Sequence, residues 1–238
     1  MKIYTQLSEF KKLDNAVVTI GTFDGVHFGH QKIIKRLCEL AKSSGGETVL
    51  LTFFPHPRMV LQNDDSIKLL NTIQERADLL EKAGLDNLII HPFDQKFSQM
   101  EAHEFVKTIL VEQFQIKKII IGYDHRFGKN RSADINDLIA FGKIYNFEVE
   151  QINAEAINKI AVSSTNIRTA LANGSIQLAN RYLGYDYFFS GKVILGIQLG
   201  RTLGFPTANL ILLEPYKLIP KEGAYIVYSA LNNTRIFG

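Results

Sequence analysis

The sequence predicts an α/β domain with a parallel sheet, followed by the start of an antiparallel β domain. Up to Gly184, short apolar runs rich in β-branched residues alternate with segments of helical periodicity. Strands that are apolar throughout and separated by helices are typical of a parallel sheet that helices cover on both faces. After Gly184 the helical periodicity is lost, and glycines and prolines separate strand-like runs.

The first domain is expected to contain five strands joined by helices. The β-branched run 16–23 is typical of a buried strand, and the helix after it carries Ile33 and Leu37 on one face. Ser98 and Glu101 fit a capping box at the start of the third helix. The predicted strands span residues 16–23, 47–54, 87–93, 117–124 and 147–153, and the predicted helices span residues 30–46, 71–86, 98–114, 135–146 and 163–174.

The second domain is expected to be incomplete. Its predicted strands span residues 187–195, 208–213 and 223–231. Three strands leave open edges and a small core, so we expect this part of the chain to be poorly packed. The chain is therefore divided into two domains, residues 1–184 and 185–238.

The composition is that of a globular protein with a hydrophobic core, because 46% of the 238 residues are hydrophobic and 21% are charged. The net charge of +3 is small and dispersed, which argues against a nucleic-acid partner. The single cysteine, Cys38, excludes an intramolecular disulfide and is interpreted as a small core residue. The N-terminus lacks the apolar stretch of a signal peptide, and no run approaches the roughly 18 apolar residues of a membrane span. We therefore expect a soluble, cytoplasmic protein without a membrane partner, and no oligomeric state is predicted.

The stretch GTFDGVHFGH follows the first predicted strand and leads into a helix. Ligands of open α/β sheets bind at the carboxyl ends of strands, and the free N–H groups of a helix N-terminus attract phosphate. Gly21, Gly25 and Gly29 allow the backbone to turn and let a flat group such as adenine approach closely. His27 and His30 can both donate hydrogen bonds to a phosphate.

Other interpretations of this stretch have less support in the sequence. The chain has no G-x-x-x-x-G-K-[ST] motif and no G-x-G-x-x-G motif after a strand, which excludes a P-loop and argues against a dinucleotide site. The histidine pair has no third metal ligand nearby, so zinc is weakly supported. A glycine turn with two surface histidines is the structural alternative.

The segment His27-Phe28-Gly29-His30 resembles the H-x-G-H signature of the nucleotidyltransferases that transfer AMP or CMP from a nucleoside triphosphate. The longer stretch resembles one branch, the bifunctional riboflavin kinase/FAD synthetases of bacteria. Five further blocks are similar to that family in the same order: TFFPHP at 52–57, GYDHRFGKNRSAD at 122–134, SSTNIR at 163–168, LGYDYFFSGKV at 183–193 and GRTLGFPTANL at 200–210.

The resemblance implies a Rossmann-like nucleotidyltransferase domain followed by the N-terminal part of a riboflavin kinase β-barrel. The implied reaction joins ATP and FMN to give FAD and pyrophosphate. The attacking FMN phosphate is anionic near neutral pH, so the site needs no general base and works by positioning and charge stabilisation.

The resemblance also assigns residues to ATP. His27 and His30 would contact the triphosphate, Gly29 would lie under the adenine, and Asp24 would shape the loop and help to place Mg²⁺. Arg168 would hold the β- and γ-phosphates and the leaving pyrophosphate. The implied catalytic residues are His27, His30 and Arg168, and the implied ATP-binding residues are Gly21, Phe23, Asp24, Gly29, Ser163, Ser164 and Thr165.

Flavin would lie across the other strand ends, with Phe54 stacked on the isoalloxazine. The remaining flavin candidates are His56, Asp124, Arg126 and Phe127. In the second domain, Gly204 would fold over phosphates, and Thr207 and Asn209 would hold Mg²⁺ and ATP for the phosphorylation of riboflavin. The family's barrel needs more residues and a later carboxylate base, so we expect no kinase activity from this chain, as a fragment or the product of a truncated gene.

Two other functions stay open on the sequence. One is a different transferase of the same superfamily, acting on a phosphopantetheine, a nicotinate mononucleotide or a glycerol phosphate. The other is a flavin-binding protein without catalytic activity.

Overall fold

The computed structural model describes residues 1–64, 66–123, 125–152, 162–204, 207–231 and 234–237. Its centre is a six-stranded sheet in the order β1-β4-β3-β2-β5-β6, and every neighbouring pair is parallel. The predicted parallel sheet is confirmed, with one strand more than expected. The strands are β1 (Lys2–Tyr4), β2 (Ala16–Ile20), β3 (Glu47–Phe54), β4 (Asn87–Pro92), β5 (Lys118–Gly122) and β6 (Glu148–Ile152).

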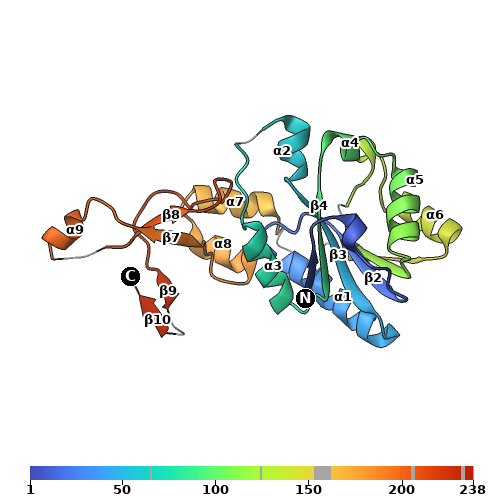
Figure 1. Ribbon diagram of the computed structural model, residues 1–238, viewed down its shortest axis with the longest axis horizontal. Helices are drawn as coiled ribbons and strands as arrows, with labels where there is room; N and C mark the ends of the chain where they lie inside the picture. The colour runs from blue at the N-terminus through green and yellow to red at the C-terminus, as the bar shows by residue number, and fades with distance from the viewer. Residues whose placement is uncertain (65, 124, 153–161, 205–206, 232–233, 238) are drawn as a thin grey trace.

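Helices cover both faces of this sheet, as predicted (Figure 1). One face packs on α1 (Phe28–Ser44) and α3 (Ile73–Lys82), through side chains such as Leu37 and Leu80. The other face packs on α5 (Ala102–Phe105), the π-helix η2 (Val106–Gln113) and α6 (Ile135–Tyr145). A third apolar cluster joins α7 (Ser164–Ala172) and α8 (Ile176–Leu183). The shorter helices are η1 (Leu7–Glu9), α2 (Pro57–Gln62), α4 (Gln95–Ser98), η3 (Lys129–Arg131) and α9 (Leu199–Thr202).

The start of α1 differs from the prediction by two residues. Its N-cap is His27, whose Nδ1 accepts a hydrogen bond from the backbone N–H of His30 at 3.4 Å. A histidine that caps a helix satisfies one of the N–H groups left without a partner in the first turn. The helix ends at Gly45, which adopts the left-handed conformation with φ 63°.

The predicted helix 98–114 is wrong at its start. Ser98 is the last residue of α4, and its Oγ donates to the carbonyl of Gln95 at 2.6 Å. Glu101 is the N-cap of α5 but makes no capping bond with its side chain. Capping boxes form instead at Thr72 and Glu75, at the start of α3, and at Asp134 and Asp137, at the start of α6.

The region after residue 184 forms two separate antiparallel pairs. Strand β7 (Gly191–Ile194) pairs with β8 (Asn209–Leu212), and β9 (Tyr228–Leu231) pairs with β10 (Thr234–Phe237). These pairs and α9 project from the first domain (Figure 1). Large apolar side chains lie in solvent here, with Leu195 85%, Ile197 93% and Ile226 95% exposed. The antiparallel strands are confirmed, and the described strands form two-stranded sheets where part of one barrel was expected.

One stretch of this region behaves differently and packs on the first domain. Leu69 and Lys217 form a parallel bridge, and the ammonium-bearing side chain of Lys217 has no exposed surface. The backbone N–H of Lys221 donates to the carbonyl of Leu171 in α7 at 2.9 Å. Contacts therefore cross the predicted boundary at residue 184. Among the described helices, none is long and apolar enough to cross a bilayer.

Amide hydrogen exchange tests this difference within the C-terminal region. We expect fast exchange in β7 and β8, whose side chains bury little surface, and slow exchange in β2, β3 and β5. The amide of Leu218 should be protected, because it donates to the carbonyl of Leu69 at 2.8 Å. Equal protection of Leu218 and the β7 amides would contradict the packing described above.

Candidate active site

The candidate site lies at the carboxyl ends of the parallel strands. The order of the strands along the chain reverses between β2 and β5, and ligands of open α/β sheets bind outside such a point. The loop from Gly21 to His27 follows β2 there and leads into α1. Ser164 of α7, 140 positions further along the chain, donates from Oγ to the backbone carbonyl of Asp24 at 2.9 Å. The two segments that the sequence analysis assigned to ATP therefore meet.

The backbone of this loop adopts conformations that L-residues rarely take. Phe23 and Val26 have φ angles of 47° and 33°, and Gly25 has 85°. A Cβ on Gly25 would lie 2.6 Å from Cδ1 of Leu70, so this position also needs glycine for space. Non-glycine residues with positive φ cost about 1–3 kcal/mol each and cluster at functional sites. Of the three glycines expected to let the backbone turn, only Gly25 has a positive φ, and Gly29 lies inside α1.

The two histidines stack on each other. Their ring centroids are 3.6 Å apart at 14°, and Phe23 stacks on the other side of His30 at 4.5 Å. Nδ1 of His30 is buried and has no hydrogen-bond partner within the described structure. Burial, followed by the electrostatic effects of His27 and Arg76, holds the pKa of His30 well below its ordinary value. The ring of His30 is therefore neutral at pH 7, with one N–H to donate.

Asp24 is the centre of the site and has no exposed surface. Both of its carboxylate oxygens accept from the backbone N–H of Leu70 at 3.0 Å, and Oδ1 accepts from that of Asn71 at 3.2 Å. Oδ2 lies 2.5 Å from Nη2 of Arg168, and Oδ1 lies 3.6 Å from Nη2 of Arg76. A buried carboxylate is stable when charges and hydrogen bonds surround it in this way.

Arg168 comes from α7 and keeps part of its side chain, 21%, in solvent. Its Nε donates to the carbonyl of Lys68 at 2.9 Å. Ser163 is the N-cap of α7, with Oγ accepting from the N–H of Asn166 at 3.1 Å, and Thr165 is exposed. The hydroxyls of the SST segment and the guanidinium of Arg168 thus sit on one end of one helix.

Arg76 belongs to the site and was missed by the sequence analysis. Its side chain is 1% exposed, Nη1 donates to Oγ1 of Thr52 at 3.5 Å, and Nε and Nη2 have no hydrogen-bond partner within the described structure. Burial lowers its pKa, and the charge of Asp24 opposes that shift. Ile73, Arg76, Ala77 and Leu80 share one helical face, so a cation on an apolar stripe was the available signal.

The predicted flavin residues divide into two groups. Phe54 is half-buried at the end of β3, with its ring 5.1 Å from that of Tyr216, and His56 caps α2 nearby. Burial lowers the pKa of His56 to about 4, with Asp24 opposing and Arg168 reinforcing the shift. The pKa of His56 therefore depends on the charges of Asp24 and Arg168, two of the residues assigned to ATP.

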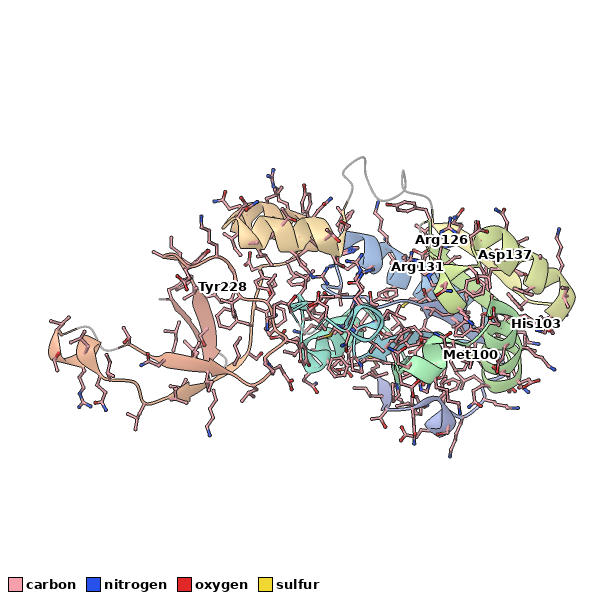
Figure 2. All side chains as sticks on the ribbon, turned by 90° about the horizontal axis from the view of Figure 1, so that it is seen from above. Met100, His103, Arg126, Arg131, Asp137 and Tyr228 are labelled. Carbon is pink, nitrogen blue, oxygen red and sulfur yellow. The ribbon has the colours of Figure 1, made fainter. Side chains whose placement is uncertain are left out.

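The other flavin candidates follow β5. Phe127 is 8% exposed and packs in the core, with its ring 6.0 Å from that of Phe105, which leaves little of it for a ligand. Arg126 is exposed, and Figure 2 shows it near Arg131 in the first domain, away from Tyr228 of the C-terminal region. Asp124 lies outside the described residues.

The kinase candidates lie apart from this site. Gly204 adopts φ 82°, and Thr207 and Asn209 are exposed at the start of β8. Figure 1 shows β8 in the projecting part of the molecule, away from α1 and its His27 cap. The structure therefore does not bring the two predicted nucleotide sites together.

Comparisons with known proteins match two family models to different parts of the chain. Residues 9–166 match the family model for FAD synthetase, and residues 183–238 match the one for riboflavin kinase. A bifunctional riboflavin kinase/FMN adenylyltransferase of Buchnera aphidicola subsp. Schizaphis graminum is 41% identical over 95% of this chain and 73% of its own length. One of Listeria monocytogenes is 38% identical over 94% and 71%. The crystal structure of a macrolide-efflux protein from Streptococcus pneumoniae is similar over 99% of this chain and 76% of its own, with 28% identity and a TM-score of 0.89.

The pH dependence of stability tests the environment of His56. Its pKa is about 4 in the folded protein against an ordinary 6.5, so between these values the unfolded chain binds a proton that the folded protein does not. The free energy of unfolding should therefore fall as pH decreases from 6.5 to 4. Urea denaturation at pH 7 and pH 5 should show a smaller fall for His56→Asn, which retains a capping side chain. An unchanged fall would show that His56 titrates normally.

Proposed function

The chain belongs to the family of bifunctional riboflavin kinase/FMN adenylyltransferases, and we propose that the site around Asp24 is where it transfers AMP from ATP to FMN. One observation carries this proposal. The carboxylate of Asp24 joins the loop before His27 to Arg168 of α7, so the two family segments assigned to the triphosphate face one point.

ATP would bind along the N-terminus of α1. His27 and His30 would contact the α-phosphate region, and Gly29 would let the adenine approach the helix. Two cations, Arg76 and Arg168, face the single negative charge of Asp24, which gives the site an excess of positive charge. Such an excess favours the binding of a triphosphate. The hydroxyls of Ser163, Ser164 and Thr165 would hold the β- and γ-phosphates with Arg168.

In the reaction, a phosphate oxygen of FMN attacks the α-phosphorus of ATP. The bond from that phosphorus to the bridging oxygen of the β-phosphate breaks, and pyrophosphate leaves with the electron pair. No proton has to be removed from the nucleophile, which suits a site where burial lowers the pKa of His30 and makes it a weak base. The N–H groups of His27, His30 and Arg168 would stabilise the charge that develops on the phosphates.

Mg²⁺ would supply charge neutralisation on the ATP phosphates. The described residues contain no group of three His, Cys, Asp or Glu side chains that could hold a metal. Magnesium in nucleotide sites keeps phosphate and water ligands and takes one or two carboxylates from the protein. The oxygens of Asp24 already accept two amides and face two guanidinium groups, so Asp24 is at most one such ligand.

FMN would lie beyond the ends of β3 and β5. Phe54 and His56 at the end of β3 are half-buried beside the triphosphate residues and would contact the flavin. Arg126 after β5 is exposed and free of the core, so it would reach the flavin or its phosphate. Phe127 would support this loop from the core.

Incubation of the 238-residue chain with Mg·ATP and FMN, followed by chromatography of the flavins, tests the function. FAD is the expected product. Unchanged FMN that remains bound to the protein would favour a flavin-binding protein. AMP transfer to a nicotinate mononucleotide or a glycerol phosphate instead of FMN would favour another member of the superfamily.

Replacement of the charged site residues should separate turnover from flavin affinity. His30→Ala and Arg168→Met should each reduce the rate of FAD formation by about 10²- to 10³-fold, because each removes a donor to the phosphates. Affinity for FMN alone should change little. His103→Ala is the matched control, since His103 of α5 bonds to the hydroxyl of Tyr145 in α6, and Figure 2 labels it at the end of the molecule opposite the C-terminal region. Equal activities of the His30 and His103 variants would refute the assignment.

Riboflavin with Mg·ATP gives a second product test. We expect no FMN from this chain, because Thr207 is exposed before β8, and Asn209 is exposed on the two-stranded sheet of β7 and β8, whose side chains lie mostly in solvent. Formation of FMN and ADP would contradict this expectation.

Arg76→Lys and Arg76→Met test the residue that the sequence analysis missed. Arg76→Met removes a buried cation beside Asp24, so it should lower the rate of FAD formation by about tenfold or more. Arg76→Lys keeps the charge and should retain more activity. If both variants turn over like the wild type, Arg76 has no part in the site.

A further inference from the structure

The segment Tyr216–Leu218 pairs with Leu69, directly before the two residues whose N–H groups bind Asp24. This segment lies in the part of the chain that matches the riboflavin kinase family model. Leu69 donates its N–H to the carbonyl of Tyr216 at 2.7 Å, and Leu218 donates its N–H to the carbonyl of Leu69 at 2.8 Å. The two segments therefore pair through one parallel β-bridge, between Leu69 and Lys217. The next residue, Leu70, is the one whose N–H reaches both oxygens of Asp24.

Lys217 fixes this pairing from inside the protein. Its side chain has no exposed surface, and its ammonium group donates to the carbonyl of Leu70 at 2.6 Å, to Oε2 of Glu75 at 2.7 Å and to the carbonyl of Phe188 at 2.7 Å. An ammonium group has three N–H donors, and all three are used. The ring of Tyr187 lies 4.6 Å from Nζ and covers it.

Glu75, the acidic partner of Lys217, lies in the first turn of α3, the helix that carries Arg76. Glu75 closes the capping box of α3 and accepts the N–H of Ser190 at 2.9 Å through its other oxygen. Arg76, which faces Asp24, is the next residue on α3. Both backbone groups of Leu70 are thus hydrogen-bonded: its N–H donates to Asp24, and its carbonyl accepts from Lys217.

We propose that Lys217 is a positioning residue for adenylyl transfer: it holds Leu70, and through Leu70 and Asp24 it sets the place of Arg168. The inference rests on the proposed function of the Asp24 site. It makes a segment of the kinase-like region part of the FAD synthetase site, where it supports catalysis without touching substrate.

The test compares Lys217→Met, Lys217→Met/Glu75→Gln and the wild type. Methionine has the length of lysine without its donors, and the double variant leaves no unpaired buried carboxylate. Both variants should have a lower thermal midpoint than the wild type, because the buried carbonyls of Leu70 and Phe188 lose their donor, so rates are compared at a temperature where circular dichroism shows each variant to be folded. At that temperature the kcat/KM of the folded double variant for FAD formation should fall by about tenfold or more, with a raised KM for ATP, because small displacements of positioning groups are costly. Lys192→Met, at an exposed lysine of β7, should change neither quantity.

A gentler pair of variants covers the case in which the lysine variants do not fold. Tyr187→Phe removes the hydroxyl that donates to the carbonyl of Leu218 at 2.7 Å, and Tyr225→Phe removes a hydroxyl that donates to the carbonyl of Lys221. Both changes delete one hydroxyl, but the first loosens the segment beside Leu70. Tyr187→Phe should lower kcat/KM severalfold, and Tyr225→Phe should not.

The outcomes separate the inference from the function. If the wild type forms FAD and the folded double variant forms it equally fast, the inference is overturned; where the lysine variants do not fold, wild-type activity of Tyr187→Phe overturns it. If the wild type forms no FAD, the proposed function fails. The inference about Lys217 is then tested separately, by calorimetric measurement of the affinity of the wild type and the variants for a non-hydrolysable ATP analogue. Weaker binding by the double variant, or by Tyr187→Phe if the former does not fold, supports the inference, and equal binding overturns it.

Discussion

The buried carboxylate of Asp24 is the interaction on which the site depends. It has no exposed surface, and it accepts the N–H groups of two consecutive residues while it faces Arg76 and Arg168. Its own backbone carbonyl accepts the hydroxyl of Ser164. A buried charge of this kind is costly unless every partner is in place, so the loop, α3 and α7 can adopt few other arrangements. The strained φ angles of Phe23 and Val26 are retained in this setting.

The groups fixed around Asp24 fit a reaction that needs charge stabilisation and no general base. The chemistry requires two anionic phosphates to approach each other, and the main obstacle is their repulsion. The site supplies two arginines, two stacked histidines and the N-terminus of α1, against one carboxylate. Burial keeps His30 neutral and covers Arg76, so these groups are fixed before the substrates arrive.

The sequence predicted the parallel sheet and the loop at β2, because apolar runs and glycine-rich turns are local signals. It failed where the outcome depends on distant neighbours. Thr72-x-x-Glu75 and Ser98-x-x-Glu101 have the same capping pattern. Of these two pairs, only Thr72 and Glu75 form a capping box. Ser98 is already the end of α4, whose own cap is Asp94. The pattern alone does not reveal this.

Buried charges were missed for a related reason. Arg76 and Lys217 are ordinary surface residues by type, and their burial follows from partners 52 and 142 positions away, Asp24 and Glu75. No local periodicity encodes such pairs. The division at residue 184 followed from the change of composition, and the contacts of Lys217 cross it because the kinase-like segment returns to the first domain.

The most direct measurement is the rate of FAD formation by Asp24→Asn, at a temperature where circular dichroism shows the variant to be folded. Asparagine keeps the shape and one acceptor oxygen but leaves both arginines without a counter-charge. The rate should fall by about 10²-fold or more, and Asp94→Asn, at the cap of α4, should be as active as the wild type. A folded Asp24→Asn variant with wild-type turnover would contradict the central role of this carboxylate.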